Sequence, residues 1–518
     1  MKKNNHFRFI GMLLIGALLF FSCSKQVPEN MAVIPKETNV VSVINLYSLA
    51  QKGKLNDISE RKFFQTMKKE IQSENKKLSK LVDDIVEDPG ITGMDVKTDI
   101  FGYYVTEKEN EYGCLSVKLN NEEKFGNFIT ELLKELEIDF DIEKEQNYRF
   151  ILVQSDLVVA WDAKKALFLT ALSYSGRKGM GAEIETLMTL KPEDQMTGND
   201  DFRKFYENKK DISVWLSANV LDDYLLEVLS EVSGMDYADS YVSAYFNFEK
   251  GKISLSAQLI PNEELKKTMK EYGGKTISFN DNLLEYLPAT SYAAISMTFD
   301  PAVFYSVFQK ERKFDDMRTM FEEELGMDVK EFAESFKGSV LFSLFDFNVN
   351  EMQPVMGLVF DINGSRTIEK VIEKAEAFGT KQNGYYRFDL DGITLYAAFN
   401  EKACLLTNDK KSVEAFQNNG FGKESLTQSP IKTGLTKNTF YGYWNLNFGE
   451  YPEIVKEIVK TTFGNDVFKL WNGFVRNVEF RSMDTMSSEF ILHLQDDTNN
   501  SLYSIIHYTD NIYNEVMP

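Results

Sequence analysis

The residues best suited to acid–base chemistry or to zinc binding are two histidines near the C-terminus. His493 and His507 stand in "FILHLQD" and "YSIIHYT", which both have the apolar pattern of strands. Neither belongs to an HExxH pair, and residues 32–275 contain no histidine that matches them. We therefore expect two partly buried strand residues without a catalytic role.

Two further motifs resemble ligand sites only in part. In "SGRKGMGAE", Gly176, Gly179 and Gly181 do not have the GxGxxG spacing of a phosphate-binding turn, and we expect a loop. In "FDLDG", Asp389 and Asp391 lack the further oxygen ligands and the closing glutamate of an EF-hand. The Asp-Gly pair instead predicts a hairpin turn.

Carboxylates and tryptophans offer glycan chemistry in principle. The 79 acidic residues could supply a catalytic pair, but no spacing singles one out. The four tryptophans could form a surface on which sugars stack: Trp161, Trp215, Trp444 and Trp471. Because Trp215 and Trp444 stand at matching places 229 residues apart, we expect core residues instead.

The stretch "GMDVK" occurs at residues 93–97 and again at 326–330. The aspartates Asp95, Asp236, Asp328 and Asp466 each stand in its Gly-x-Asp pattern. Glycine often ends a helix, and aspartate is a favoured N-cap of the next one. We therefore interpret these aspartates as helix caps, with metal ligation or acid–base catalysis as the alternative. Glu331 adds the spacing of a capping box.

The repeated motif belongs to a longer internal repeat. Five pairs keep their order with offsets between 229 and 241: Gly93 and Gly326, Tyr148 and Tyr386, Thr170 and Thr407, Gly179 and Gly420, Trp215 and Trp444. Such regular spacing predicts a tandem duplication. We place the first repeat at residues 32–275 and the second at 276–518.

Each predicted repeat combines hairpins and helices. Hairpin turns are expected at Lys250–Gly251 and Asp391–Gly392, and helices at residues 120–136 and 364–378. The fold class predicted is α+β, with two tandem homologous halves. Each half should have an antiparallel β-sheet with helices packed on one face.

The N-terminus has the layout of a bacterial lipoprotein signal. Lys2, Lys3 and Arg8 precede an apolar run of eleven residues, which is too short to span a bilayer, and Cys23 follows Ser22. We predict a lipoprotein signal peptide at residues 1–22, lipid on Cys23, and a tether at residues 23–31. The lipid would hold the chain to a membrane without a spanning helix.

The composition excludes several partners. Removing residues 1–22 takes the formal net charge from −21 to −24, which argues against nucleic acid and against binding to anionic lipid through basic patches. After Cys23 only Cys114 and Cys404 remain. Buried strand thiols are the expected state, and pairing between them stays open. We predict no cofactor, no metal site and no catalytic residue.

A family resemblance follows from the order of these features. A lipoprotein signal, "LP-x-T", an alternating strand, a helix, Gly-x-Asp and a strand pair resemble Bacteroidota lipoproteins of about this length that are grouped as a domain of unknown function. The resemblance covers nearly the whole chain after the signal. It implies tandem α+β units, and no activity or site.

The sequence therefore predicts a lipid-anchored cell-envelope protein that acts as a binding or scaffolding module. One alternative is a carboxylate-based hydrolase of glycans or cell wall, and another is a carrier of an apolar ligand. Glu29 is the one acidic residue in "SKQVPEN", directly after Cys23, so we expect the outer membrane facing the periplasm, with surface exposure as the alternative. The protein or small-molecule partner is not specified.

Overall fold

The fold is that of a computed structural model. It describes residues 28–516 apart from residues 108–109, 154–155, 174–175, 221–226, 228–235, 273–276, 310–317, 320–321, 324–325, 365, 375–378, 391, 483 and 485. The predicted signal peptide and Cys23 lie outside the described residues.

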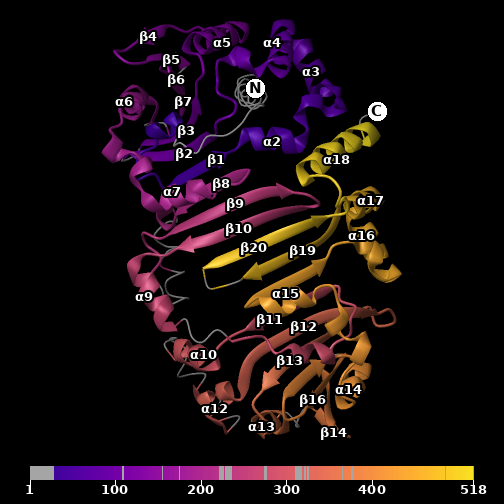
Figure 1. The fold of residues 1–518 in the computed structure, drawn as a ribbon. Helices are drawn as coiled ribbons and strands as arrows, with labels where there is room; N and C mark the ends of the chain where they lie inside the picture. Colours follow the sequence, from indigo (N-terminus) through magenta and orange to yellow (C-terminus); the bar gives the residue numbers. More distant parts are fainter. Residues whose placement is uncertain are drawn as a thin grey trace. The chain divides into compact units, whose positions relative to one another are not determined.

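The chain divides into two compact units (Figure 1). Unit 1 comprises Met1–Asp222, Asp239–Leu255 and Asp496–Pro518, and unit 2 comprises Asp223–Ala238 and Ser256–Gln495. The chain therefore returns to unit 1 after it has completed unit 2. The repeat boundary predicted at residues 275 and 276 stays a prediction.

The strands of both units pair in antiparallel fashion, and the predicted α+β class is confirmed. The first ten strands are β1 (Val40–Ile44), β2 (Ile100–Glu107), β3 (Asn110–Lys118), β4 (Ile142–Lys144), β5 (Arg149–Val153), β6 (Leu157–Trp161), β7 (Lys165–Ala171), β8 (Ile212–Ser217), β9 (Tyr241–Glu249) and β10 (Lys252–Ile260). The other ten are β11 (Ala293–Thr298), β12 (Phe336–Asn348), β13 (Gln353–Ile362), β14 (Gly379–Gln382), β15 (Tyr385–Leu390), β16 (Ile393–Phe399), β17 (Ala403–Thr407), β18 (Phe440–Asn445), β19 (Val475–Ser482) and β20 (Ser487–Leu494).

The two sets of ten strands have the same order. In the first set the neighbours run β4, β5, β6, β7, β3, β2, β1, β8, β9, β10. In the second set they run β14, β15, β16, β17, β13, β12, β11, β18, β19, β20. Each strand of the second set thus has the same neighbours as the strand numbered ten lower.

Helices accompany each set. Those of unit 1 are α2 (Leu46–Gly53), α3 (Lys62–Glu74), α4 (Lys76–Glu87), α5 (Glu122–Glu135), α6 (Gly176–Met188), α7 (Asp200–Glu207) and α18 (Ser501–Val516). Those of unit 2 are α9 (Glu263–Tyr272), α10 (Pro301–Phe308), α12 (Val329–Glu334), α13 (Arg366–Lys374), α14 (Lys410–Gln417), α15 (Lys432–Lys437), α16 (Glu453–Phe463) and α17 (Asn465–Phe474). Helices α5 and α13 lie where the sequence predicts them.

In unit 1 the helices cover both faces of the sheet. All five residues of β6 are buried, and alternate residues of a strand point to opposite faces. On one face, Trp161 lies edge-on to Phe125 of α5, with ring centroids 5.8 Å apart. On the other face, α6 packs against β3, β6 and β7, and its Ile184 and Leu187 are buried. The prediction of helices on one face is therefore wrong, because short polar connections carry helices to both sides.

In unit 2 the two faces are covered unequally. One face has a core of 17 buried residues, to which α14 contributes Val413 and Phe416. The other face has a cluster of only five buried residues, with Ile368 of α13 among them. The cluster under α2, α3, α4 and α5 in unit 1, by comparison, contains 25 buried residues. Much of the second face of unit 2 is therefore left without a helix among the described residues.

The two copies of "GMDVK" lie in different local structures. Gly93 ends a 3-10 helix, Pro89–Thr92, in the left-handed conformation, but Asp95 then caps a turn by accepting from Lys97 N at 3.1 Å. Asp328 does cap a helix, because it accepts from Lys330 N at the start of α12. The helix-cap interpretation is thus confirmed for Asp328 and wrong for Asp95.

The other caps also differ from the prediction. Asp466 is the second residue of α17, and Gly464, with φ of 90°, separates α16 from α17. Asp236 accepts from Ala238 N in a turn, while Gly234 lies outside the described residues. Glu331 pairs with Lys370 of α13 at 3.4 Å. For Asp236 a turn, and for Glu331 a tertiary contact, satisfies the side chain that local spacing assigned to a cap.

The two motif glycines allow a matched test of backbone strain against steric exclusion. Both have a positive φ, but a Cβ on Gly93 would lie 2.5 Å from Asn121 O and Phe125 N, whereas a Cβ on Gly326 would meet nothing within 4 Å. We expect Gly93→Ala to lower the free energy of unfolding by about 3 kcal/mol or more, and Gly326→Ala by about 1 kcal/mol. Calorimetric unfolding measures both. Equal losses would mean that the clash at Gly93 is relieved by movement of the loop.

Candidate functional site

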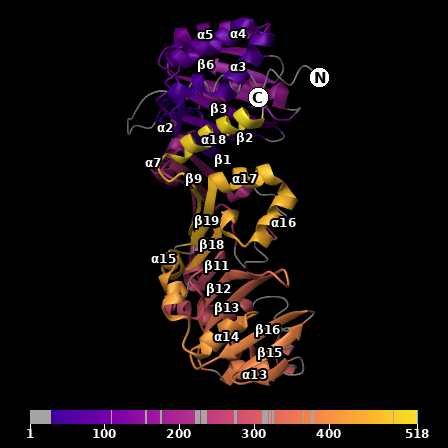
Figure 2. The same ribbon diagram turned by 90° about the vertical axis from the view of Figure 1, so that its right-hand side faces the viewer.

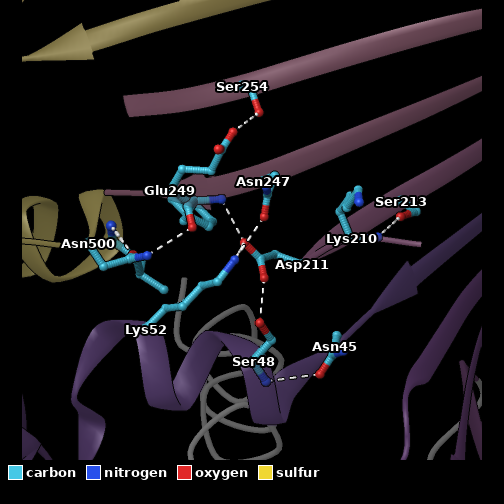
Figure 3. A network of polar contacts seen from close by, with 12 residues as sticks. Asn45, Ser48, Lys52, Lys210, Asp211, Ser213, Asn247, Glu249, Ser254 and Asn500 are labelled. Atoms are coloured by element: carbon cyan, nitrogen blue, oxygen red, sulfur yellow. Dashed lines mark hydrogen bonds and ion pairs between the residues drawn. The ribbon is translucent and has the colours of Figure 1, made fainter. Parts of the chain in front are cut away.

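The most extensive polar network of unit 1 surrounds the Asp211 carboxylate (Figure 3). Its Oδ1 accepts from Ser48 Oγ at 2.6 Å, and its Oδ2 accepts from Lys52 Nζ at 2.7 Å and from Phe248 N at 2.6 Å. Lys52 Nζ also donates to Asn247 Oδ1 at 2.8 Å. The network thus joins α2, the start of β8 and the end of β9.

This network has the residue types of a catalytic site but the bonding of a structural one. The Asp211 side chain is 2% exposed, and both of its oxygens are occupied by donors from the same unit. Asn500, just before α18, donates to Phe248 O at 2.9 Å. A buried carboxylate that accepts three hydrogen bonds holds elements together, and at 2% exposure it offers a substrate almost no accessible oxygen.

A second titratable cluster lies on β18, β19 and β20 in unit 2. His493 Nε2 lies 2.9 Å from Glu479 Oε1, and Arg481 lies 3.4 Å from Glu479 and 3.5 Å from Glu489. Burial acts to raise the pKa of the Glu479 carboxyl, but the hydrogen bonds from His493 and Tyr441 and the Arg481 charge together hold that pKa below its usual range. Burial, followed by the charge of Glu479, raises the pKa of Tyr441.

An imidazole beside a carboxylate is a general acid–base pair in chemical terms. Here the carboxylate is shared among an imidazole, a guanidinium and a phenol of the same sheet. These partners stabilise its charged form, which makes it a weak base. His493 lies in β20, as the sequence predicts, and the cluster explains its place without a reaction.

Two predictions about the local structure of the candidate residues are wrong. His507 lies in α18 rather than in a strand, because the apolar residues of "YSIIHYT" follow the period of an amphipathic helix. Gly176, Gly179 and Gly181 lie in α6 rather than in a loop. In unit 2 the aligned Gly420 does lie in a loop, with φ of 96° after α14. The glycine repeat therefore does not mark equivalent positions.

The other candidate ligands are dispersed or engaged locally. Asp389 accepts from Arg387 and from Thr394 on the facing strand of the predicted hairpin, and Asp391 lies outside the described residues. Within the part of the chain that the structure describes, no three His, Cys, Asp or Glu side chains are grouped so as to hold a metal ion.

The two cysteines of the described residues are buried free thiols in strands. Cys114 lies in β3 and Cys404 in β17. Burial raises the pKa of the Cys114 thiol, and it raises the pKa of Cys404 to about 12. Neither is a reactive nucleophile at neutral pH, because a thiol reacts as its thiolate.

The tryptophans do not share one environment. Val41 of β1 pairs with Trp215, and the equivalent Ala294 of β11 pairs with Tyr443. Trp444 therefore lies one residue out of register with Trp215, and a shift of one residue turns a side chain to the other face. Trp215 is fully buried, whereas Trp444 is 53% exposed. The prediction of equivalent core positions is correct for Trp215 and wrong for Trp444.

Trp161 and Trp471 complete this contrast. Trp161 is fully buried under α5, as expected of a core residue. Trp471, on α17, is 42% exposed, and its Nε1 donates to Leu446 O at 3.1 Å. The four side chains do not form one stacking surface, since two are inside unit 1 and two are at the surface of unit 2.

Trp444 belongs to a broad apolar surface of unit 2. On its face, directly paired residues form a continuous row across seven neighbouring strands: Phe490, Phe480, Gly442, Ile295, Phe342, Leu358 and Leu406. Four of them are about 40% exposed: Phe490, Phe480, Ile295 and Leu406. Antiparallel sheets usually alternate apolar residues toward the core with polar residues toward water.

We call this surface the open face and define it by its residues on β11, β12, β18, β19 and β20. They are Ala293, Ile295, Met297, Val340, Phe342, Leu344, Phe440, Gly442, Trp444, Val478, Phe480, Ser482, Ser488, Phe490 and Leu492. None of them is charged. Contiguous exposed apolar surface of this kind usually marks an interaction site.

The equivalent face of unit 1 has smaller side chains, and helices cover it. The positions that match Ile295, Phe342 and Phe480 are Ser42, Gly102 and Ala244. Over this face, Leu46 of α2 joins the buried cluster, and α18 contacts α2, α3 and β9. A Cβ on Gly53 of α2 would lie 2.9 Å from Ile506 of α18, so these two helices pack closely. Among the described residues, the two units therefore differ in how far helices cover this face of the sheet.

Sequence reasoning missed the open face, although the strands contain a signal for it. Phe490, Ile491 and Leu492 are consecutive apolar residues in β20, and Val340, Leu341 and Phe342 are consecutive in β12. Such runs indicate a strand that is apolar on both faces. The signal does not say which face a helix of the same chain covers.

A shallow pocket of about 530 Å³ lies beside the C-terminal end of α5. Its lining is mostly polar: Thr130, Lys134, Glu137, Ile138, Asp139 and Phe140. An apolar ligand would need a lining of hydrophobic side chains. None of the helices in the described residues is both long enough and apolar enough to cross a bilayer.

Comparison with known proteins gives one family match. The model of the family described as "Domain of unknown function (DUF4836)" matches residues 30–502. No protein with a curated description matches the chain.

Among solved structures, crystal forms of TP0453, a Treponema lipoprotein, are similar to part of the chain. Form I is 10% identical and covers 48% of this chain and 85% of its own, form IV is 12% identical and covers 45% and 81%, and form III is 12% identical and covers 48% and 86%. The TM-score is 0.25 in each case, which is too low to bear on fold or function.

If the Asp211 network is structural, breaking it destabilises unit 1. We expect Asp211→Asn to lower the free energy of unfolding by about 3 kcal/mol, because Lys52 loses its buried partner. The matched control is Asp201→Asn, which breaks the exposed pair with Lys204 and should cost less than about 1 kcal/mol. Denaturant unfolding distinguishes the two. A loss as small as that of the control would contradict the structural role.

Proposed function

We propose that this chain, which belongs to the family described as a domain of unknown function (DUF4836), is a lipid-anchored envelope protein that binds a protein partner through the open face of unit 2. The observation that carries the proposal is the uncharged apolar surface across β11, β12, β18, β19 and β20, with Trp444 its most exposed side chain. The chain would act as a binding or scaffolding module and not as an enzyme.

The shape of the open face favours a protein over a small apolar ligand. Its backbone N–H and C=O groups are used in the strand ladder, so it offers side-chain contacts only. Its five strands at about 4.8 Å spacing span about 19 Å, and the apolar row continues onto β13 and β17, a width that suits one side of a standard protein interface. A small ligand needs a concave site that encloses most of its surface. A partner with an apolar helix or sheet face meets the requirement.

The alternative of a hydrolase has less support. Glu479, with its lowered pKa, is already shared among His493, Arg481 and Tyr441, and Asp211 is buried and accepts three hydrogen bonds from its own unit. A glycosidase requires two carboxyl groups of different pKa on either side of a substrate cleft. The carrier alternative requires an apolar cavity, whereas the pocket beside α5 is lined by polar residues.

We further infer that the chain arose by tandem duplication of an α+β unit. The support is the identical neighbour order of β1–β10 and β11–β20, together with the repeated "GMDVK". The two copies would then have diverged in how far helices cover one face of their sheet. This divergence gives the binding proposal a simple history: a face that was once an internal core became an external contact.

In this proposal the lipid on Cys23 determines where the protein is located. Cys23 with its preceding signal would be cut and lipidated, and residues 23–31 would connect it to β1 as a brief tether. We place the protein on the outer membrane facing the periplasm, because "SKQVPEN" contains one acidic residue after Cys23. Nucleic acid is not an expected partner of so acidic a chain.

Photo-crosslinking in living cells can identify the partner that binds the open face. We expect a photo-crosslinking residue at position 480 or 444 to form a reproducible crosslink to a protein, because both side chains lie in the exposed row or beside it. The matched control is position 349, which is also an exposed apolar residue of unit 2 but lies in the turn between β12 and β13. Mass spectrometry identifies what each position retains.

Two other results would count against this function. Crosslinks to lipid or glycan alone from position 480 would favour the carrier or the hydrolase. Crosslinks that are the same from positions 349 and 480 would show that the open face has no special role. A Phe480→Ser and Phe490→Ser double variant should keep its unfolding temperature within a few degrees and lose the crosslinked partner.

The anchor has a separate test. We expect Cys23→Ala to abolish incorporation of a labelled fatty acid, because the lipid has no other attachment site, and to weaken retention in the membrane fraction. Cys114→Ala serves as the control, since this thiol is buried. Continued incorporation of the label into the Cys23→Ala chain would contradict lipid anchoring at Cys23.

A further inference from the structure

Helices α16 and α17 form a hairpin that stands away from the strands of unit 2 (Figure 2). Neither helix has a buried residue. The base of the hairpin is held by Trp471 Nε1, which donates to Leu446 O, and by Gly449 N, which donates to Asn472 Oδ1 at 3.3 Å. Gly464 forms the tip with φ of 90°, and a Cβ there would meet nothing within 4 Å.

The hairpin exposes large apolar side chains near this tip. Phe463 is 63% exposed and Val467 is 50% exposed, and Ile458 and Trp471 are also exposed. Val467 and Trp471 are one turn apart and lie on the same face of α17. The two helices therefore present apolar surface away from the core, and the residues of this surface are not part of the open face.

The polar side chains in the last two turns of α16 are bonded within the hairpin. Thr461 Oγ1 donates to Glu457 O at 2.7 Å, and Thr462 Oγ1 donates to Ile458 O at 2.8 Å. Lys460 Nζ binds Glu457 at 2.6 Å and lies 5.3 Å from the centre of the Phe468 ring. The two threonine hydroxyl donors can therefore leave water without losing their hydrogen bonds, and the charges of Lys460 and Glu457 neutralise each other.

The charge of the hairpin also differs from that of the chain. Residues 453–474 contain three lysines, Lys456, Lys460 and Lys469, and three acids, Glu453, Glu457 and Asp466. The hairpin is thus neutral, while the chain has a net charge of −21. A neutral element is the part of an acidic protein that a phospholipid surface repels least.

From this combination we propose that the tip of the α16–α17 hairpin inserts into a phospholipid membrane surface. A protein interface carries a hydrogen bond for about every 100–200 Å², which needs donors and acceptors that are free to bond outward. The last two turns of α16 bond their threonine hydroxyls inside the helix, and both helices offer hydrocarbon outward near the tip, as an interfacial amphipathic helix does. The aromatic Trp471 lies farther from the tip, where the headgroup boundary would be.

The consequence for the whole chain is a second membrane contact. One lipid-modified residue and one apolar hairpin would act together, because the first contact raises the local concentration for the second. The inference goes beyond the protein partner of the open face, which uses different residues. The two can therefore succeed or fail independently.

The test places a fluorescent label at single cysteines of the full chain. Phe463→Cys and Val467→Cys report the tip, and Lys469→Cys is the matched control, because residue 469 lies between Val467 and Trp471 in sequence and hence on another side of α17. The buried Cys114 and Cys404 should not compete for the label. Unfolding temperatures equal to that of the unlabelled protein confirm that each variant is folded.

The labelled proteins are mixed with phosphatidylcholine–phosphatidylethanolamine vesicles that contain acyl chains brominated at a known depth. We expect an emission shift to shorter wavelength and loss of intensity by bromine quenching at positions 463 and 467, and little of either at position 469. Added phosphatidylglycerol should weaken the shift, since the acidic chain is repelled by anionic lipid.

A second measurement removes the contribution of the lipid on Cys23. In a Cys23→Ser chain, the further changes Phe463→Ser and Val467→Ser should lower the vesicle partition constant at least about tenfold. Water-like emission from positions 463 and 467 in every vesicle composition would overturn the proposal. So would quenching of all three positions to the same extent, because that result would indicate non-specific adsorption of the chain.

Discussion

The constraint behind this structure is that a β-strand turns its side chains alternately to two sides. A sheet therefore creates two surfaces, and each must face either water or a second layer of the protein. Unit 1 meets this condition on both sides, as the five buried residues of β6 show. Among the described residues of unit 2 only one side meets it fully, because the row from Phe490 to Leu406 on the other side is apolar and stays partly in contact with solvent. The fold, its asymmetry and the open face follow from how each side is covered.

Local patterns in the sequence predict the elements well where one interaction decides the outcome. The hairpin at Lys250–Gly251 and helices α5 and α13 agree with turn chemistry and apolar spacing, and Asp328 caps a helix as expected. Predictions fail where tertiary contacts compete. Asp95 caps a turn because the chain leaves Gly93 toward β2, and Glu331 binds Lys370 instead of closing a capping box. Local spacing cannot rank these partners.

The candidate sites depend on the register of the strands and on which helices pack over each face, and both are properties of the assembled sheet. Trp215 and Trp444 look equivalent in sequence, yet a shift of one residue places one in the core and the other at the surface. Glu479 and His493 meet only because β19 and β20 are neighbours. Consecutive apolar residues in β12 and β20 do reveal that both faces of these strands are apolar. They do not reveal that α18, the helix after β20, belongs to unit 1, where it packs on α2.

The position of α18 affects how the chain can mature. Synthesis and export deliver a polypeptide from its N-terminal end, so β1–β9 emerge long before residues 501–516. Until α18 arrives, the side of unit 1 around α2 and β9 lacks one of its covering helices, whereas unit 2 has all of its own residues available earlier. The N-terminal unit is therefore the last to be completed. Premature termination would therefore damage the beginning of the protein more than its middle.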